Sequence, residues 1–180
     1  MNRAVFLDRD GVLNRSIVRD GRPYAPTSVA EFALLPDAVS SVDALKNAGF
    51  LVVVFTNQPD VAVGRQSRAT VEAMHGILRD AMPLDDIRTC FHGEGDECDC
   101  RKPKPGMILA AARDHDIDCR RSYVVGDRWR DIAAGKAAGC TTIFIDYGYQ
   151  EPRPDSPDAT VANLAEAAVF IRQRETRKGP

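Results

Sequence analysis

The segment Ala4-Val5-Phe6-Leu7-Asp8-Arg9-Asp10-Gly11 decides the fold expected for this chain. Its first four residues form an uncharged apolar run, which is typical of a strand buried on both faces of a parallel sheet. The run ends at two aspartates one residue apart, and the glycine after them allows a sharp turn. Because ligands collect at the carboxyl ends of strands in open α/β sheets, Asp8 and Asp10 are expected at a functional site. A divalent cation, most simply Mg²⁺, would relieve the repulsion between two such carboxylates.

Strand-like and helix-like segments alternate along the rest of the chain. This alternation predicts an α/β fold, a doubly wound parallel sheet with helices on both faces, in a single domain over residues 1–180. Residues 15–30 are expected to form a loop or small flap with little regular structure, and residues 174–180 a flexible tail. After the first strand, the expected strands are 51–55, 87–91, 122–125 and 141–145, and the expected helices are 37–48, 67–81, 105–114, 131–138 and 164–173.

Composition and charge narrow the class of protein. The 180 residues carry a net charge of −2 with no Lys/Arg-rich run, so we expect no nucleic-acid partner. No apolar stretch approaches membrane-spanning length, and the first strand begins too early for a signal peptide. We therefore expect a cytoplasmic protein, without a membrane partner and monomeric, that acts on a small molecule.

Polar residues follow several of the expected strands. Thr56 and Asn57 follow the second strand, Lys102 and Lys104 precede a helix, and Asp127 follows the fourth strand. The carboxylates could bind a metal, and the hydroxyl and the cations could bind an anion. This combination suits phosphoryl transfer.

Four motifs in this order resemble the haloacid dehalogenase (HAD) superfamily of phosphatases. They are Asp-Arg-Asp-Gly-Val from Asp8, Phe-Thr-Asn-Gln from Phe55, Arg-Lys-Pro-Lys-Pro from Arg101 and Val-Gly-Asp-Arg-Trp-Arg-Asp from Val125. The resemblance implies a HAD-type fold without a large cap domain, and Mg²⁺-dependent phosphomonoester hydrolysis through an aspartyl-phosphate.

Roles for individual residues follow from the same resemblance. Asp8 would attack phosphorus, and Asp10 would act as general acid and base. Thr56 and Lys102 would hold the phosphoryl group, with Lys102 favoured over Lys104 because it directly follows Cys100-Arg101. The ligands implied for Mg²⁺ are Asp8, the backbone carbonyl of Asp10, and Asp127. Asp131 is either a carboxylate that supports the site without binding the metal or a solvated residue in the first turn of a helix.

The segment 90–100 contains Cys90-x-His92 and, five residues later, Cys98-x-Cys100. Three thiolates with an imidazole suit a tetrahedral Zn²⁺ site, and four protein ligands would make that zinc structural. The alternatives are a chance cluster and a redox pair. Zinc would fix the loop that delivers Arg101 and Lys102.

This loop resembles a subgroup of the superfamily that contains heptose 1,7-bisphosphate phosphatases and histidinol-phosphate phosphatases. The Lys104-Pro105-Gly106-Met107 helix start favours the heptose enzymes, whereas the short cysteine spacing is closer to the histidinol enzymes, and Pro59-Asp60 replaces the Ser-Gly usual in the heptose enzymes. We expect the 7-phosphate of D-glycero-D-manno-heptose 1,7-bisphosphate as the group removed, with histidinol phosphate or another sugar phosphate as the alternative. The residues expected to contact substrate are Arg9, Asn57, Gln58, Arg101 and Arg128.

Two other classes share parts of this pattern. A signalling receiver domain also uses a phosphorylated aspartate, but there that aspartate follows the third strand, whereas Asp8 follows the first. A zinc-containing interaction module without activity would usually have lost one of the catalytic residues, and all are present. A dinucleotide-binding enzyme is disfavoured because no Gly-x-Gly-x-x-Gly follows the first strand.

Overall fold

The centre of the molecule is a six-stranded parallel sheet with the strand order β5-β4-β1-β6-β7-β8. A computed structural model of the chain describes residues 1–178, and the side chains of residues 1–177. The strands of this sheet are β1 (Ala4–Leu7), β4 (Leu51–Asn57), β5 (Asp86–Cys90), β6 (Tyr123–Gly126), β7 (Thr141–Ile145) and β8 (Ala159–Val161). The chain therefore has the α/β, doubly wound fold that the alternation of segments predicts.

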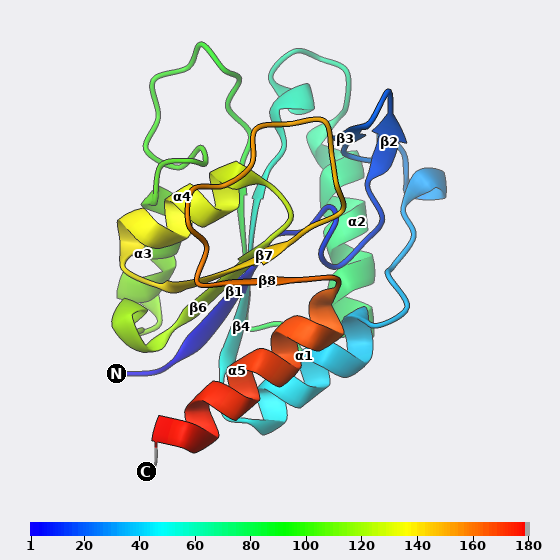
Figure 1. Cartoon of the computed structure of the whole chain (residues 1–180). Coiled ribbons are helices and arrows are strands. Elements are labelled where there is room, and N and C mark those ends of the chain that lie inside the picture. The colour runs from blue at the N-terminus through cyan, green and yellow to red at the C-terminus, as the bar shows by residue number, and fades with distance from the viewer. Residues whose placement is uncertain (179–180) are drawn as a thin grey trace.

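Helices cover both faces of the sheet (Figure 1). The helices are α1 (Ala38–Asn47), α2 (Arg68–Ala81), α3 (Gly106–Asp114), α4 (Trp129–Ala138) and α5 (Leu164–Lys178), with 3-10 turns at Val29–Glu31, Pro59–Val61 and Cys119–Arg121. Helices α1 and α5 pack side by side on one face, whereas α3 and α4 cover the other. No helix within residues 1–178 is long and apolar enough to cross a membrane.

The central strand β1 shows why this arrangement forms. Val5 and Leu7 belong to the core beneath α1, α2 and α5, whereas Ala4 and Phe6 belong to the core beneath α3 and α4. All four side chains are 0 % exposed. Because successive side chains of a strand point to opposite faces, only an unbroken apolar run can fill two cores at once.

Three features of the fold differ from the sequence-based expectation. Residues 15–30 contain an antiparallel hairpin, β2 (Ile17–Arg19) and β3 (Arg22–Tyr24), instead of an irregular flap. Its turn is Asp20-Gly21, with φ angles of 48° and 71°, and an Asp-Gly dipeptide between short β-prone runs is a hairpin signal. Strand β8 is a sixth strand that was not expected. Helix α5 continues to Lys178, so it includes most of the expected tail, and the rest of that tail lies outside the described residues.

Candidate active site

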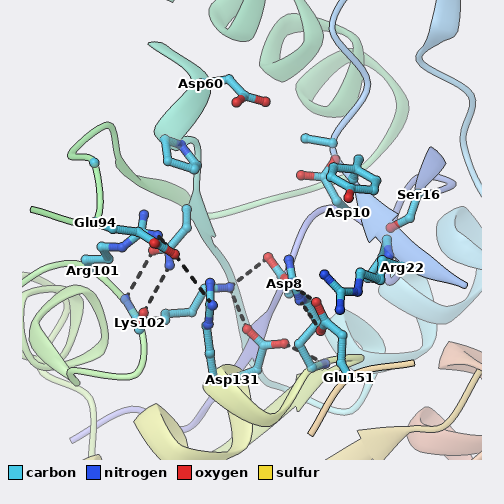
Figure 2. Close-up of a pocket in the computed structure, with 18 of the residues that line it drawn as sticks. Asp8, Asp10, Ser16, Arg22, Asp60, Glu94, Arg101, Lys102, Asp131 and Glu151 are labelled. Carbon is cyan, nitrogen blue, oxygen red and sulfur yellow. Dashed lines mark hydrogen bonds and ion pairs between the residues drawn. The ribbon is translucent and has the colours of Figure 1, made fainter. Parts of the chain in front are cut away.

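Lys102 occupies the centre of a carboxylate cluster at the carboxyl edge of the sheet. Its Nζ lies 2.8 Å from Oδ1 of Asp8 and 2.6 Å from Oδ1 of Asp131, and it donates to the carbonyl of Phe55 at 3.0 Å. Figure 2 shows the Lys102 side chain reaching between the two carboxylates. The surrounding carboxylates raise the pKa of Lys102 despite its burial, so the site contains a fixed positive charge.

Asp127 completes the acidic cluster from the end of β6. Its side chain is buried, and neither carboxylate oxygen has a hydrogen-bond donor within 3.5 Å in the described part of the chain. Burial and the charges of Asp8 and Asp131 raise its pKa well above the usual range. Gly11 lies directly against this group, because a Cβ at Gly11 would come within 1.9 Å of Asp127 Oδ2, and its φ of 85° also favours glycine.

The donor set of this cluster fits a divalent cation. One carboxylate oxygen from each of Asp8, Asp127 and Asp131 lies within 4.8 Å of the others. Burial, and then the charge of Asp131, raises the pKa of Asp8 to about 7 even though Lys102 opposes this shift. Asp131 accepts hydrogen bonds from Lys102 on Oδ1 and from the backbone N–H of Arg128 on Oδ2. Both oxygens of Asp127 remain available to bind a metal. Asp131 is 1 % exposed, which excludes the solvated alternative.

Asp10 is held by three side chains behind it. Arg9 binds its carboxylate through Nε and Nη2 at 3.0–3.1 Å. Asn14 donates to Oδ1 at 2.9 Å, and Gln58 donates to Oδ2 at 2.8 Å. Asp10 is thus held in one orientation at the wall of the cavity described next.

A cavity of about 500 Å³ opens above Asp8 and Asp10. This volume is typical of a site for a small ligand. Its wall is rich in arginines contributed by segments far apart in the sequence, namely Arg22, Arg65, Arg101, Arg128 and Arg130. The predicted residues Asn57, Arg101 and Arg128 line this cavity, together with Lys102. The same wall carries the carboxylates of Asp8, Asp10, Asp60, Glu94, Asp131 and Glu151, and four of the arginines pair with one of them. Arg22 forms no ion pair within the described part of the chain, so it is a cation available to an anionic ligand.

The structure corrects the positions expected for Arg9 and Gln58. Both were predicted to contact substrate, yet both are 0 % exposed and neither lines the cavity. Arg9 follows β1 and Gln58 follows β4, and the polar groups of both side chains bind Asp10 instead. Thr56 is buried as well, and its Oγ1 accepts a hydrogen bond from Gln58 at 2.9 Å.

The structure also separates Lys102 from Lys104. Lys104 is directed away from the acidic cluster: its side chain is 57 % exposed and its Nζ donates to the carbonyl of Cys98. Asn57 binds the backbone of Lys102 in both directions, accepting from its N–H at 3.1 Å and donating to its carbonyl at 3.2 Å. This pair of bonds fixes the chain where Lys102 enters the site.

Several lining residues were missed by the sequence reasoning. Arg22 and Tyr24 come from the hairpin that was expected to be irregular, and only the Asp20-Gly21 turn signal could have located them. Glu151 lies in the proline-rich segment after β7 and binds the Arg128 guanidinium, with Oε2 2.8 Å from Nε. No local pattern marks Glu151, because its partner is 23 positions away in the sequence.

The four predicted zinc ligands converge. One ligand atom from each of Cys90, His92, Cys98 and Cys100 lies within 4.8 Å of the others. All of these cysteines are free thiols, with Cys90 and Cys100 Sγ atoms 3.0 Å apart. Three sulfurs and one imidazole nitrogen packed this closely fit a tetrahedral thiophilic metal.

The loop of residues 90–100 connects to the cavity through Arg101. The Arg101 guanidinium donates to the carbonyl of His92 at 3.1 Å and lies 3.5 Å from the Glu94 carboxylate. Figure 2 shows Arg101 and Glu94 together at one side of the site. The position of Arg101 therefore depends on the conformation of the loop.

Known proteins are similar to this chain in sequence and in fold. Residues 99–167 match the HAD-hydrolase-like family model. The D-glycero-beta-D-manno-heptose-1,7-bisphosphate 7-phosphatase of Pseudomonas putida is 37 % identical over 154 residues, which cover 83 % of this chain and 85 % of that protein. The enzyme of the same name from Escherichia coli K12 is 36 % identical, over 96 % of this chain and 95 % of its own.

The chain belongs to the HAD-like phosphatase family. Among solved structures, D,D-heptose 1,7-bisphosphate phosphatase from Bordetella bronchiseptica, complexed with magnesium and phosphate, matches with a TM-score of 0.83 at 33 % identity. The match covers 96 % of this chain and 99 % of that one. This chain is thus a phosphatase with the HAD-type fold and no large cap, and membership in the family excludes the receiver-domain alternative.

Proposed function

We propose that this phosphatase removes the 7-phosphate of D-glycero-D-manno-heptose 1,7-bisphosphate in a magnesium-dependent reaction. The observation that carries the proposal is the match to heptose bisphosphate phosphatases over nearly the whole chain. Arg22 of the cavity wall supports it, because it forms no ion pair within the described part of the chain and a bisphosphate needs cations beyond those that hold the reacting phosphoryl group. Histidinol phosphate is the alternative substrate, and it has only one phosphate to bind.

Asp8 is the proposed nucleophile. A carboxylate oxygen of Asp8 forms a bond to phosphorus while the bond from phosphorus to the sugar oxygen breaks, and Asp10 gives its proton to that oxygen. Water then attacks the aspartyl-phosphate, Asp10 takes a proton from the water, and the bond from phosphorus to Asp8 breaks. Phosphate leaves and both carboxylates return to their initial states.

Charge neutralisation is the contribution of the surrounding residues. A dianionic phosphate is repelled by Asp8 unless cations offset its charge, and Lys102 is 2.8 Å from Asp8. Asp8, Asp127 and the backbone carbonyl of Asp10 would hold Mg²⁺, which would supply further neutralisation of the phosphate oxygens. The buried, unpartnered oxygens of Asp127 support this assignment. Thr56 and Lys102 would orient the phosphoryl group.

We also propose that Cys90, His92, Cys98 and Cys100 hold a structural Zn²⁺. Four protein ligands leave no open coordination position, so this metal would not act on substrate. Its effect would be to keep the loop in the conformation that fixes Arg101 at the cavity. The small cavity-lining segments, this loop and the β2–β3 hairpin, would then select the leaving group in place of a cap domain.

The experiment that tests the function is phosphate release with Mg²⁺ present, using both anomers of heptose 1,7-bisphosphate, histidinol phosphate and a panel of sugar monophosphates. We expect kcat/KM for one heptose bisphosphate anomer to exceed that for every monophosphate by at least about 100-fold, from the charge-assisted contacts to a second phosphate. Preference for histidinol phosphate would overturn the substrate assignment. Absence of phosphate release from every compound by metal-loaded protein would overturn the proposed function.

A further inference from the structure

The Arg9 guanidinium connects Asp10 to helix α2. Arg9 is 0 % exposed. Its Nε and Nη2 bind the Asp10 carboxylate, whereas Nη1 lies 3.4 Å from Nε2 of His75. Within the described part of the chain, His75 is the only hydrogen-bond partner of Nη1. The ring of Phe32, with its centroid 5.7 Å from the guanidinium carbon, packs on the same group.

The surroundings of His75 determine which ring nitrogen carries the proton. A guanidinium can only donate hydrogen bonds, so Nε2 must present its lone pair to Arg9. The proton of the neutral ring then lies on Nδ1, which is 3.5 Å from Oε2 of Glu72, one helical turn earlier. Glu72, His75, Arg9 and Asp10 thus form a chain of donors and acceptors that runs from the surface of α2 to the cavity.

We propose that His75, supported by Glu72, is a positioning residue for Asp10 that acts through Arg9. This inference rests on the proposed role of Asp10 as general acid and base. His75 touches neither the cavity nor the reacting atoms, so it is not itself a catalytic residue. Its neighbours in the sequence show no motif that marks it.

The geometry explains what the contact with His75 adds. The paired guanidinium and carboxylate form a flat unit, but both groups lie at the ends of rotatable side chains of residues adjacent in the sequence. Asn14 and Gln58 bind the Asp10 end of this unit, whereas at the guanidinium end Nη1 has only His75 as a hydrogen-bond partner within the described part of the chain. His75 binds the far side of the guanidinium from a helix that is packed into the core, and it therefore holds the guanidinium in the plane from which Arg9 binds Asp10. A general acid must meet the leaving oxygen within hydrogen-bond reach, so this orientation affects proton transfer.

The test uses substrates that differ in their need for a general acid. Sugar and alkyl phosphates have strongly basic leaving oxygens that require protonation, whereas p-nitrophenolate leaves without it. For His75→Leu we expect kcat/KM on a sugar phosphate to fall by about tenfold or more, which is part of the roughly 100-fold to 10⁴-fold that general acid catalysis contributes. We expect kcat/KM on p-nitrophenyl phosphate to stay within about threefold of the parent, because kcat/KM covers only the steps up to the aspartyl-phosphate and this leaving group needs no general acid. For His75→Gln, whose side-chain oxygen can accept from Arg9, we expect at least partial recovery of the sugar-phosphate rate.

Leu78→Ala is the matched control on the same helix, because Leu78 is 0 % exposed and belongs to the core beneath α1, α2 and α5. It should lower the melting temperature without changing the ratio of the two rates. Equal losses of kcat/KM for His75→Leu on both substrates, or no loss on either in a protein that melts as a single folded species, would overturn the inference. Failure of the parent protein to hydrolyse any phosphate ester would instead overturn the proposed function, so the two failures are distinguishable.

Discussion

The Nζ atom of Lys102 lies 2.8 Å from Oδ1 of Asp8, and both side chains are buried, at 3 % and 9 % exposure. A second carboxylate, Asp131, lies 2.6 Å from the same nitrogen. One lysine therefore faces two acids in a buried setting, with Asp127 as a third acid nearby. Removing one member of such a cluster leaves the remaining buried charges without a partner of opposite sign. Mutating the members one at a time therefore shows what each contributes to activity and to stability.

Replacing Lys102 by methionine should affect both activity and stability. We expect phosphate release to fall at least about 100-fold, and the free energy of unfolding to fall by about 3 kcal/mol, because Asp8 and Asp131 lose their common cation. The measurements are steady-state kinetics and urea unfolding. Lys104→Met is the control. The Lys104 side chain is exposed, so the free energy of unfolding should change by less than about 0.5 kcal/mol and activity should persist. Full activity of Lys102→Met would contradict the role proposed for Lys102.

Replacing Asp8 by asparagine should remove turnover but keep the fold. We expect a loss on the order of 1,000-fold or more in kcat, since an amide cannot form the aspartyl-phosphate. The raised pKa of Asp8 indicates that ionisation of this group is already opposed by burial, so the melting temperature should stay within about 4 °C of the parent. Asp43→Asn, on the exposed side of α1, serves as the control for the same chemical change. Residual turnover above about one tenth of the parent rate would assign the nucleophile elsewhere.

Loss of one thiolate ligand should release the proposed structural metal. We expect the parent protein to carry about one zinc per chain and Cys98→Ser to carry much less, with a lower melting temperature and reduced activity. Elemental analysis measures the zinc content, thermal melting measures the stability, and phosphate release measures the activity. Cys119→Ser, outside the cluster, should retain its zinc. Equal zinc content and stability in Cys98→Ser and the parent would exclude a structural zinc in this loop.

His75 predicts a specific dependence of stability on pH. Burial, and then the Arg9 charge, lowers its pKa from 6.5 to about 4, so the unfolded chain binds more protons than the folded protein between these values. The free energy of unfolding should therefore fall as pH falls from 6.5 to about 4, with roughly 2 kcal/mol due to this group. The groups that face it are Arg9, Glu72 and Arg79. Urea titrations should show a shallower acid decline in His75→Leu than in the parent, and an identical slope in both would contradict the assignment.

Much of the candidate site was predictable because its residues are tied to strand ends. Asp8, Asp10 and Asp127 follow apolar runs, and the end of each such run marks the catalytic edge of the sheet in the sequence. The cysteine loop was predictable from ligand type and spacing, and its four ligand atoms converge within 4.8 Å. The hairpin β2–β3 was missed although its Asp20-Gly21 turn is a local signal, because its strands are only three residues long.

The sequence by itself determined the fold class, the phosphatase family and the acids, lysine and thiols around which the site is built, since these depend on local pattern and chain order. The tertiary structure decided the directions of side chains. It turned Arg9 and Gln58 inward to hold Asp10, turned Lys102 into the acidic cluster and Lys104 out of it, and joined Arg22 of the hairpin to Arg128 in one cavity wall. The physical reason is that beyond a strand end the backbone no longer alternates, so a side chain takes the direction that its packing and hydrogen-bond partners from distant segments allow.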